Sequence, residues 1–156
     1  DGLVFIPFGN GVERIMQNKP VGAHLLGLDL LKHDKRHVIR AAQEGIVSAL
    51  TYGFRIMKDM GMNLQTVKAG HANMFLSPLF RKTFVHMNRV NLELYDTDGA
   101  QGAARGAGIG AGVFQSEAEA FQGLELLETL EPNQNFFEPY EEVYQNWESH
   151  LKSVSK

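Results

Sequence analysis

Small residues at the end of a predicted strand are the clearest candidates for chemistry in this chain. The apolar run that begins at Thr66 predicts a strand, and a turn formed by Gly70 and His71 follows it directly. Glycine lets a backbone approach a ligand closely, and in open α/β sheets ligands bind beyond the carboxyl ends of the strands. We therefore expect a ligand site at residues 69–73. Two roles stay open for His71, packing against a ligand or filling the turn, and its place beside Gly70 favours the first.

Two aspartates follow the next predicted strand, at residues 91–94. Asp98 lies just before a predicted helix, where an aspartate usually caps the free N–H groups, and we expect this role for it. For Asp96 two roles stay open: an ordinary cap, or a carboxylate that orients a ligand hydroxyl or a magnesium-bound water. The sequence therefore places a second group of polar side chains at the end of a strand.

Several motifs of well-known chemistry are missing or incomplete. The chain has no G-x-x-x-x-G-K-[ST] phosphate-binding loop. Among its six histidines, His33 and His37 have the four-residue spacing of a zinc metalloprotease, but the glutamate of that motif is missing and the predicted helix begins between them. Residues 106–111 fit the loose dinucleotide pattern G-x-G-x-x-A, but the residues before them look helical, whereas the pattern requires a strand there. We expect neither a zinc site nor a dinucleotide site.

Two consecutive strand-turn-helix units position these residues. In the first unit, the strand at Thr66 leads through the turn into a helix at residues 77–87. In the second unit, the strand at residues 91–94 leads into a helix at residues 99–112 that is rich in glycine and alanine. Because small residues cover two adjoining faces of that helix, we expect it to press against another helix or a nucleotide.

A long amphipathic helix precedes the two units. Asp34 is its predicted N-cap and Gly61 its terminator, and interior glycines such as Gly45 indicate close packing against a neighbouring element. Its predicted buried face consists of Val38, Ala42, Ile46, Ala49, Leu50, Gly53 and Met57.

Further elements are predicted at both ends of the chain. A buried strand at residues 3–6 ends at Pro7, and a short strand lies within residues 23–30. Ser116 is the predicted cap of a helix at residues 117–128. The last helix has an apolar stripe formed by Tyr140, Val143, Tyr144, Trp147 and Leu151. This alternation of strands and helices predicts one α/β domain.

Composition excludes several classes of function. The formal net charge is −3 and the charges are spread along the chain, so we expect no nucleic-acid partner. The absence of cysteine excludes disulfides and thiolate metal sites. Without a bilayer-length apolar run or a signal-like start, we expect no membrane partner and a cytoplasmic location. Because the chain opens at Asp1, almost directly in a strand, we expect it to be an excised part of a longer protein.

The order of several motifs resembles one known family. The motifs are GLVFIPF, GVER, AAQEGIVSAL, AGHA and DTDGAQGAA, beginning at residues 2, 11, 41, 69 and 96. Together they look like the C-terminal domain of the FGGY carbohydrate kinases, nearest to the xylulokinases. The resemblance implies that residues 1–156 are part of that domain, a ribonuclease H-like α/β fold of the actin-like ATPase kind, without the N-terminal lobe and the start of the domain.

The resemblance also implies where a nucleotide binds. In such kinases two lobes close on ATP and a sugar, and AGHA lies where the family has Gly-Gly-Gly-Ala against the adenosine. The implied nucleotide-binding residues are Ala69, Gly70, His71, Ala72, Asn73 and Phe75. The catalytic aspartate and the phosphate-holding turn precede this region in the family, so no catalytic or metal-binding residue is expected in this chain.

The implied activity is the ATP- and Mg²⁺-dependent phosphorylation of a ketose, D-xylulose, by the whole protein, with ATP or ADP and the sugar held jointly with the missing lobe. The chain alone is expected to be inactive. Two alternatives stay open: another kinase of this family, acting on glycerol, ribulose or gluconate, or a non-catalytic interaction domain in which the glycine-alanine helix is the interface of a homodimer. Nucleotide binding, and its loss in Gly70→Val, would separate the two classes.

Overall fold

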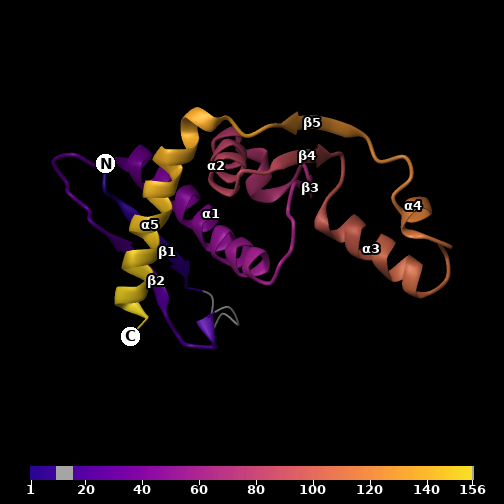
Figure 1. The fold of residues 1–156 in the computed structure, drawn as a ribbon, viewed down its shortest axis with the longest axis horizontal. Helices are drawn as coiled ribbons and strands as arrows, with labels where there is room; N and C mark the ends of the chain where they lie inside the picture. Colours follow the sequence, from indigo (N-terminus) through magenta and orange to yellow (C-terminus); the bar gives the residue numbers. More distant parts are fainter. Residues whose placement is uncertain (10–15, 156) are drawn as a thin grey trace.

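The computed structural model describes residues 1–9 and 16–155 (Figure 1). Two 3₁₀ turns, Asn73–Leu76 and Gln134–Phe136, precede the second and the last helix. The strands and helices follow one another in the order β1 (Val4–Phe8), β2 (Gly22–Leu26), α1 (Lys35–Asp59), β3 (Thr66–Gly70), α2 (Pro78–Asn88), β4 (Asn91–Tyr95), α3 (Gly99–Gly110), α4 (Glu117–Ala120), β5 (Leu126–Leu130) and α5 (Phe137–Val154).

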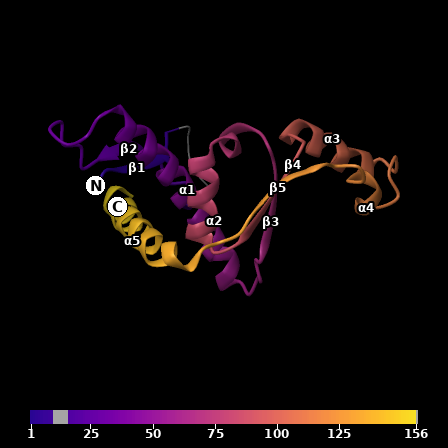
Figure 2. The ribbon, with the colours of Figure 1, turned by 90° about the horizontal axis from the view of Figure 1, so that it is seen from above.

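The elements are arranged in layers (Figures 1 and 2). The antiparallel hairpin of β1 and β2 lies at one end beside α5, the helices α1 and α2 lie in the middle, and a second sheet lies beyond α2. The core fills the space between these layers. Its largest fully buried side chains are Trp147, Tyr144, Phe80, Phe84, Ile6 and Leu92.

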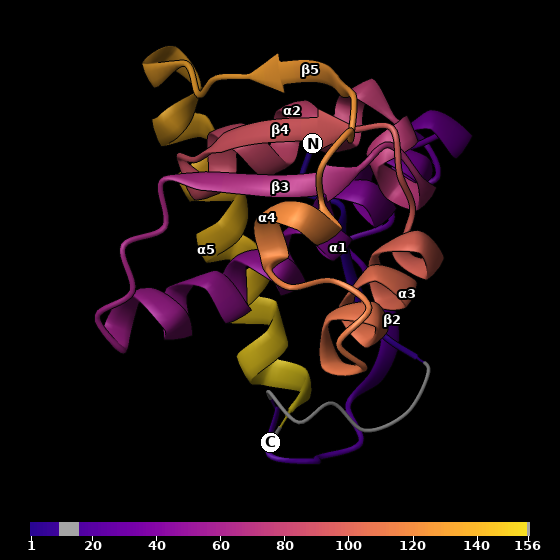
Figure 3. The same ribbon diagram turned by 90° about the vertical axis from the view of Figure 1, so that its right-hand side faces the viewer.

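The second sheet has the strand order β3-β4-β5 (Figure 3). Strands β3 and β4 are parallel, with Thr66 opposite Asn91 and Gly70 opposite Tyr95, and α2 provides the crossover that a parallel pair requires. The carboxyl ends of both strands therefore lie at the same edge. The two predicted strand-turn-helix units are confirmed, since β3 leads into α2 and β4 leads into α3.

Helix α1 begins and ends where the sequence predicts, but it buries a different face. Asp34 accepts hydrogen bonds from the backbone N–H groups of Arg36 and His37, and Gly61 follows the helix with a φ of 88°. The buried residues are Ala41, Gly45, Val47, Ser48 and Thr51, one position away from much of the predicted face.

Two local features explain this shift. A Cβ at Gly45 would lie 3.0 Å from the carbonyl carbon of Phe5, so the glycine allows the helix to touch the backbone of β1, as predicted for it. The hydroxyls of Ser48 and Thr51 donate to the helix carbonyls of Glu44 and Val47, at 2.8 and 2.9 Å. Because these polar groups are satisfied within the helix, they can be buried although a hydropathy pattern counts them as exposed.

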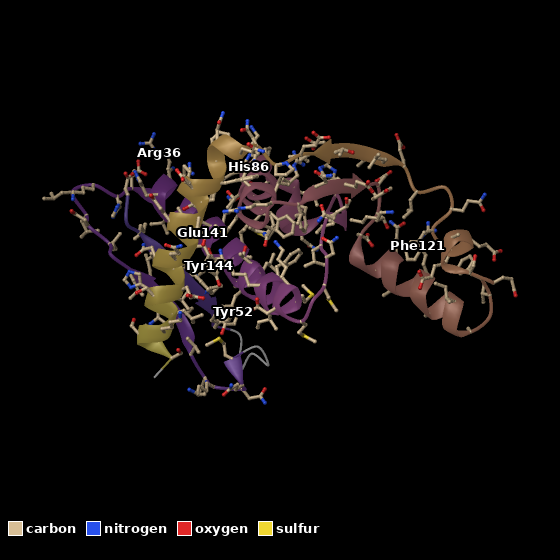
Figure 4. The ribbon with its side chains drawn as sticks, viewed as in Figure 1. Arg36, Tyr52, His86, Phe121, Glu141 and Tyr144 are labelled. Atoms are coloured by element: carbon tan, nitrogen blue, oxygen red, sulfur yellow. The ribbon has the colours of Figure 1, made fainter. Side chains whose placement is uncertain are left out.

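Helix α5 follows the prediction closely. Tyr140, Tyr144, Trp147 and Leu151 are buried, and Val143 packs against the same core. The indole N–H of Trp147 donates to the carbonyl of Phe5 at 3.0 Å and ties the helix to β1. Figure 4 shows Tyr144 and Glu141 lying between α5 and α1.

Two predicted boundaries are wrong. Strand β1 continues through Pro7, which pairs with Ala23 in a sheet of two strands, where each strand keeps a free edge and a missing N–H is tolerated. The helix predicted at residues 117–128 ends at Ala120, although Ser116 does cap it. Gly123 adopts a φ of 79°, and the chain then pairs with β4 as β5, so strand pairing replaces the helix.

The glycine-alanine helix also departs from expectation. Helix α3 projects with α4 from the end of the second sheet (Figures 1 and 2), and none of its residues is buried. A Cβ added at Gly102, Gly106 or Gly110 would meet nothing within 4 Å in the described residues. Within the described residues no helix packs against this face, and the alternative of a contact with a nucleotide stays a prediction.

The GVER motif at residues 11–14 lies outside the residues that the structure describes. In residues 1–9 and 16–155, no helix is long and apolar enough to cross a membrane.

Candidate functional site

The candidate site begins where β3 and β4 end. The N–H of His71 donates to the carbonyl of Tyr95 at 2.9 Å, which extends the contact between the strands by one residue. The chain then turns, with the N–H of Ala72 bonded to the carbonyl of Gly70 at 2.8 Å, and the 3₁₀ turn Asn73–Leu76 leads to α2. The parallel pairing thus holds the turn in place.

A cavity of about 280 Å³ opens beside this turn, and we call it the strand-end cavity. Helix α1 contributes Ile46 and Leu50, while Phe80 of α2 and Gly99 at the start of α3 complete the wall. The turn side is formed by Ala69, Gly70, Ala72, Asn73, Met74 and Phe75.

The lining of the strand-end cavity is apolar apart from backbone groups and one amide side chain, that of Asn73. No ionisable side chain is among the lining residues. Small-molecule sites are usually apolar with a few placed polar groups, so this lining suits an uncharged, apolar part of a ligand better than a phosphate.

Five of the six predicted nucleotide-binding residues meet at this cavity. They are Ala69, Gly70, Ala72, Asn73 and Phe75. The sixth, His71, is exposed and does not line the cavity, so the structure does not bring it together with the others. The backbone is extended at Ala72 (φ −145°, ψ 167°). Because neighbouring side chains along an extended backbone point to opposite sides, His71 and Ala72 face in different directions.

Gly70 lines the cavity, but its close backbone contact is with the chain itself. A Cβ at Gly70 would lie 3.0 Å from the carbonyl carbon of Thr97 and 3.3 Å from the Cα of Asp98. The residue type therefore allows the segments that follow β3 and β4 to touch. The sequence-based explanation, a close approach of the backbone to a ligand, is not needed to account for this glycine.

Asn73 is the polar group of the cavity that could select a ligand. Its backbone is left-handed, with a φ of 51°, a conformation that asparagine adopts more readily than most residues. An amide side chain offers one acceptor and two donors, the combination that pairs with the edge of an adenine ring.

The two aspartates beyond β4 have separate surroundings. Asp98 is confirmed as the cap of α3, because its Oδ1 accepts from the N–H of Gln101 at 2.8 Å. Asp96 is exposed and is not among the residues that line the strand-end cavity. Within the described ranges, no group of three or more histidine, aspartate or glutamate side chains could hold a metal ion.

Two ionisable side chains of β4, those of Tyr95 and Glu93, are hydrogen-bonded to each other. The hydroxyl of Tyr95 donates to Glu93 at 2.7 Å, and this hydrogen bond raises the pKa of Tyr95. The phenol therefore stays neutral at physiological pH and brings no negative charge to the site.

Several lining residues were not predicted. Ile46 and Leu50 were assigned to the buried face of α1, yet both line the cavity and Leu50 keeps 41% of its surface exposed. Met74, Phe80 and Gly99 carry no sequence signal that separates them from core or turn residues. No sequence signal separates Ile46 and Leu50 from the rest of the apolar stripe on α1, which has the width expected for a single packed face.

The amino-acid sequence of the chain is similar to that of a known sugar kinase. No family model matches the chain. The chain is 25% identical to the xylulose kinase of Haemophilus influenzae over 162 aligned positions, which cover 99% of this chain and 32% of that protein. The chain thus spans about a third of the length of this curated relative.

Solved structures agree with this match. The xylulose kinase of Rhodospirillum rubrum has a TM-score of 0.75 at 21% identity, over 99% of this chain and 31% of its own. The glycerol kinase of Plasmodium falciparum, solved with ADP, has a TM-score of 0.73 at 17% identity, over 98% of this chain and 31% of its own.

These matches establish a mixed α/β fold of the kind found in sugar kinases. The resemblance to sugar kinases that the motif order indicates is confirmed, and xylulose kinases are among the proteins that the chain resembles.

Proposed function

We propose that this chain holds the adenosine of ATP in the C-terminal, ribonuclease H-like lobe of a sugar kinase. The observation that carries the proposal is the strand-end cavity, an apolar space with one amide at the ends of two parallel strands. Ile46, Leu50 and Phe75 would contact the base, and the amide of Asn73 would bond its edge.

The whole protein would transfer the terminal phosphoryl group of ATP to a ketose, D-xylulose, and give D-xylulose 5-phosphate. The curated xylulose kinase relative supports this choice of sugar. The likeness to a glycerol kinase keeps another sugar or polyol as the alternative. In keeping with a kinase of small sugars and with the negative net charge, we further propose a cytoplasmic protein without nucleic-acid or membrane partners.

The lining of the strand-end cavity does not suit the terminal phosphates of ATP or Mg²⁺. Phosphoryl transfer needs cationic groups and Mg²⁺ around the terminal phosphates, and Mg²⁺ needs oxygen ligands such as carboxylates. The lining offers neither, so Mg²⁺ and the phosphates would be held by groups outside this cavity. We therefore expect the chain alone to bind nucleotide weakly and to phosphorylate no sugar.

The decisive experiment compares two substitutions on one helix. Leu50 borders the cavity and Ile56 does not, while the two side chains are exposed to nearly the same extent, 41% and 40%. Saturation-transfer NMR detects weak binding of ADP to the chain, and Leu50→Glu should abolish the signal because it puts a charge against the base. Ile56→Glu should leave it intact.

Absence of ADP binding by the wild-type chain, or equal binding by both variants, would overturn the proposal. The interaction-domain alternative would then take its place, since the bare face of α3 at Gly102, Gly106 and Gly110 is open to a second copy of the chain. In that case sedimentation should show a dimer that a bulky Gly106→Leu substitution disperses.

A further inference from the structure

Arg81 lies behind the wall of the strand-end cavity and joins three elements. Its Nη1 donates to the carbonyl of Phe75 in the 3₁₀ turn at 3.1 Å. Its Nη2 lies 3.4 Å from an oxygen of Glu128 on β5. The side chain is only 12% exposed, so one guanidinium on α2 connects the turn to the far strand of the sheet from a largely buried position.

The segment that Arg81 contacts is one short 3₁₀ turn, Asn73–Leu76. Two backbone hydrogen bonds close the turn, from Phe75 to Ala72 at 3.1 Å and from Ser77 to Met74 at 3.0 Å. Arg81 adds a hydrogen bond from a charged donor, which is stronger than a bond from a neutral donor, to this backbone.

The ring of Phe75 is fixed from the other side. It packs edge to face against Phe80 and Phe84, with ring centroids 5.3 and 5.6 Å apart. The backbone of Phe75 is thus held by Arg81 and its side chain by two rings of α2. A change at Arg81 would therefore move a wall residue of the cavity without removing any lining side chain.

The burial of Arg81 lowers the stability of the chain in a way that does not apply to a surface arginine. Its Nε is buried and has no hydrogen-bond partner among the described residues. An unpaired buried donor lowers stability, and such groups tend to persist where a particular geometry is needed.

We infer that Arg81 is a positioning residue for the nucleotide wall, and that Glu128 of β5 holds it in place. The role in nucleotide binding rests on the proposed function, whereas the placement of Phe75 does not. Strand β5, which lies outside the strand-end cavity, thereby acts on the site through one ion pair.

The test uses the 156-residue chain and four variants. Arg81→Met removes both contacts, Glu128→Gln weakens only the second, and Arg81→Lys keeps a positive donor. Lys82→Met is the matched control, because Lys82 is the exposed neighbour on the same helix. Backbone amide shifts in ¹⁵N NMR report the position of residues 72–76, and a titration with ADP reports affinity.

We expect Arg81→Met to shift the amides of residues 72–76 and to weaken ADP binding about tenfold, because binding must then also order the wall residue Phe75. Glu128→Gln should act in the same direction with a smaller effect, Arg81→Lys should recover part of the affinity, and Lys82→Met should change neither readout. If Arg81→Met unfolds the chain, Arg81→Lys and Glu128→Gln decide the question by the same readouts.

Unchanged amides and unchanged affinity in Arg81→Met would overturn the inference. Shifts spread evenly over the chain would do so too, because they would indicate a general structural role. If the wild-type chain binds no ADP, the proposed function fails, while the amide shifts still decide whether Arg81 positions Phe75.

Discussion

Gly70 and Thr97 touch through their backbones at the edge of the sheet where β3 and β4 end. A Cβ at Gly70 would lie 3.0 Å from the carbonyl carbon of Thr97, closer than side chains normally approach. This contact fixes the two loops of the candidate site to each other. It also means that Gly70→Val would disturb the site whether or not a nucleotide binds there, so that variant does not separate a nucleotide site from a plain turn.

The contact predicts a loss of stability in Gly70→Ala. The added methyl group must displace the Thr97 backbone, and overpacking of this kind costs about 1–3 kcal/mol of unfolding free energy. Urea denaturation measures the change. Gly99→Ala is the control, because a Cβ there meets nothing within 4 Å, and it should leave the stability unchanged or slightly higher. Equal stabilities of Gly70→Ala and the wild type would contradict the observed contact.

Trp147 should report the docking of α5 on β1. Its side chain is 2% exposed, its N–H donates to the carbonyl of Phe5, and the chain has one tryptophan, so native fluorescence should be shifted to the blue and should move to the red on unfolding. Trp147→Phe should lower the unfolding free energy by about 2 kcal/mol, through the lost volume and the lost hydrogen bond. Phe121→Leu, at a 43% exposed residue, should change it by less than about 0.5 kcal/mol.

The contact between α1 and α5 depends on Arg55. Its Nη2 donates to both oxygens of Glu141, at 2.9 and 2.7 Å, and its guanidinium lies 3.7 Å from the ring centroid of Tyr144. At a side chain that is 38% exposed, water screens part of this energy, and we expect Arg55→Met to cost about 1–2 kcal/mol in urea denaturation.

A second measurement tests the same pair. Burial by itself would raise the pKa of Glu141, but the hydrogen bonds and charge of Arg55 outweigh it and hold the pKa below its usual value. Arg55→Met should therefore raise the pKa of Glu141 in an NMR titration of the carboxyl carbon. The exposed pair of Arg36 with Asp34 provides the control, and Arg36→Met should leave that pKa unchanged.

The stability of the chain should fall in mild acid partly because of His86. Burial, and then the positive charge of Lys82, lower the pKa of His86 from its ordinary value of 6.5, and its Nδ1 accepts from the N–H of Asn133 at 3.2 Å. The unfolded chain then takes up a proton before the folded chain does. The unfolding free energy therefore decreases as the pH falls through about 6.5, and it levels off below the folded-state pKa.

His86→Phe tests this dependence. The new ring keeps the stacking on Phe136 but does not titrate, so the difference in stability from the wild type should shrink as the pH falls. Denaturation in urea between pH 8 and pH 5 measures it, with His71→Phe at an exposed turn residue as the control. A difference that stays constant across this range would show that His86 does not contribute to the acid sensitivity.

The helix caps and the apolar stripe of α5 were predicted well from the sequence because they depend on residues that are close together in the chain. A carboxylate before a helix caps it wherever that helix lies, which is why Asp34 and Asp98 are confirmed. The apolar stripe of α5 follows the helical period for the same reason. The face of α1 was mispredicted because Ser48 and Thr51 satisfy their hydroxyls within the helix, and their hydropathy does not reveal this.

By itself the sequence determined the order of the main elements, their principal caps, the glycines at close contacts and the segment where a ligand site was expected. Only the tertiary structure decided that residues 126–130 pair with β4 rather than continue a helix, since a strand needs a partner that is distant in sequence. The tertiary structure likewise brought Ile46 and Leu50 of α1 to the cavity at the turn that follows β3, and it left His71 of that turn outside the cavity. A cavity is a property of several elements at once, and no single stretch of sequence encodes it.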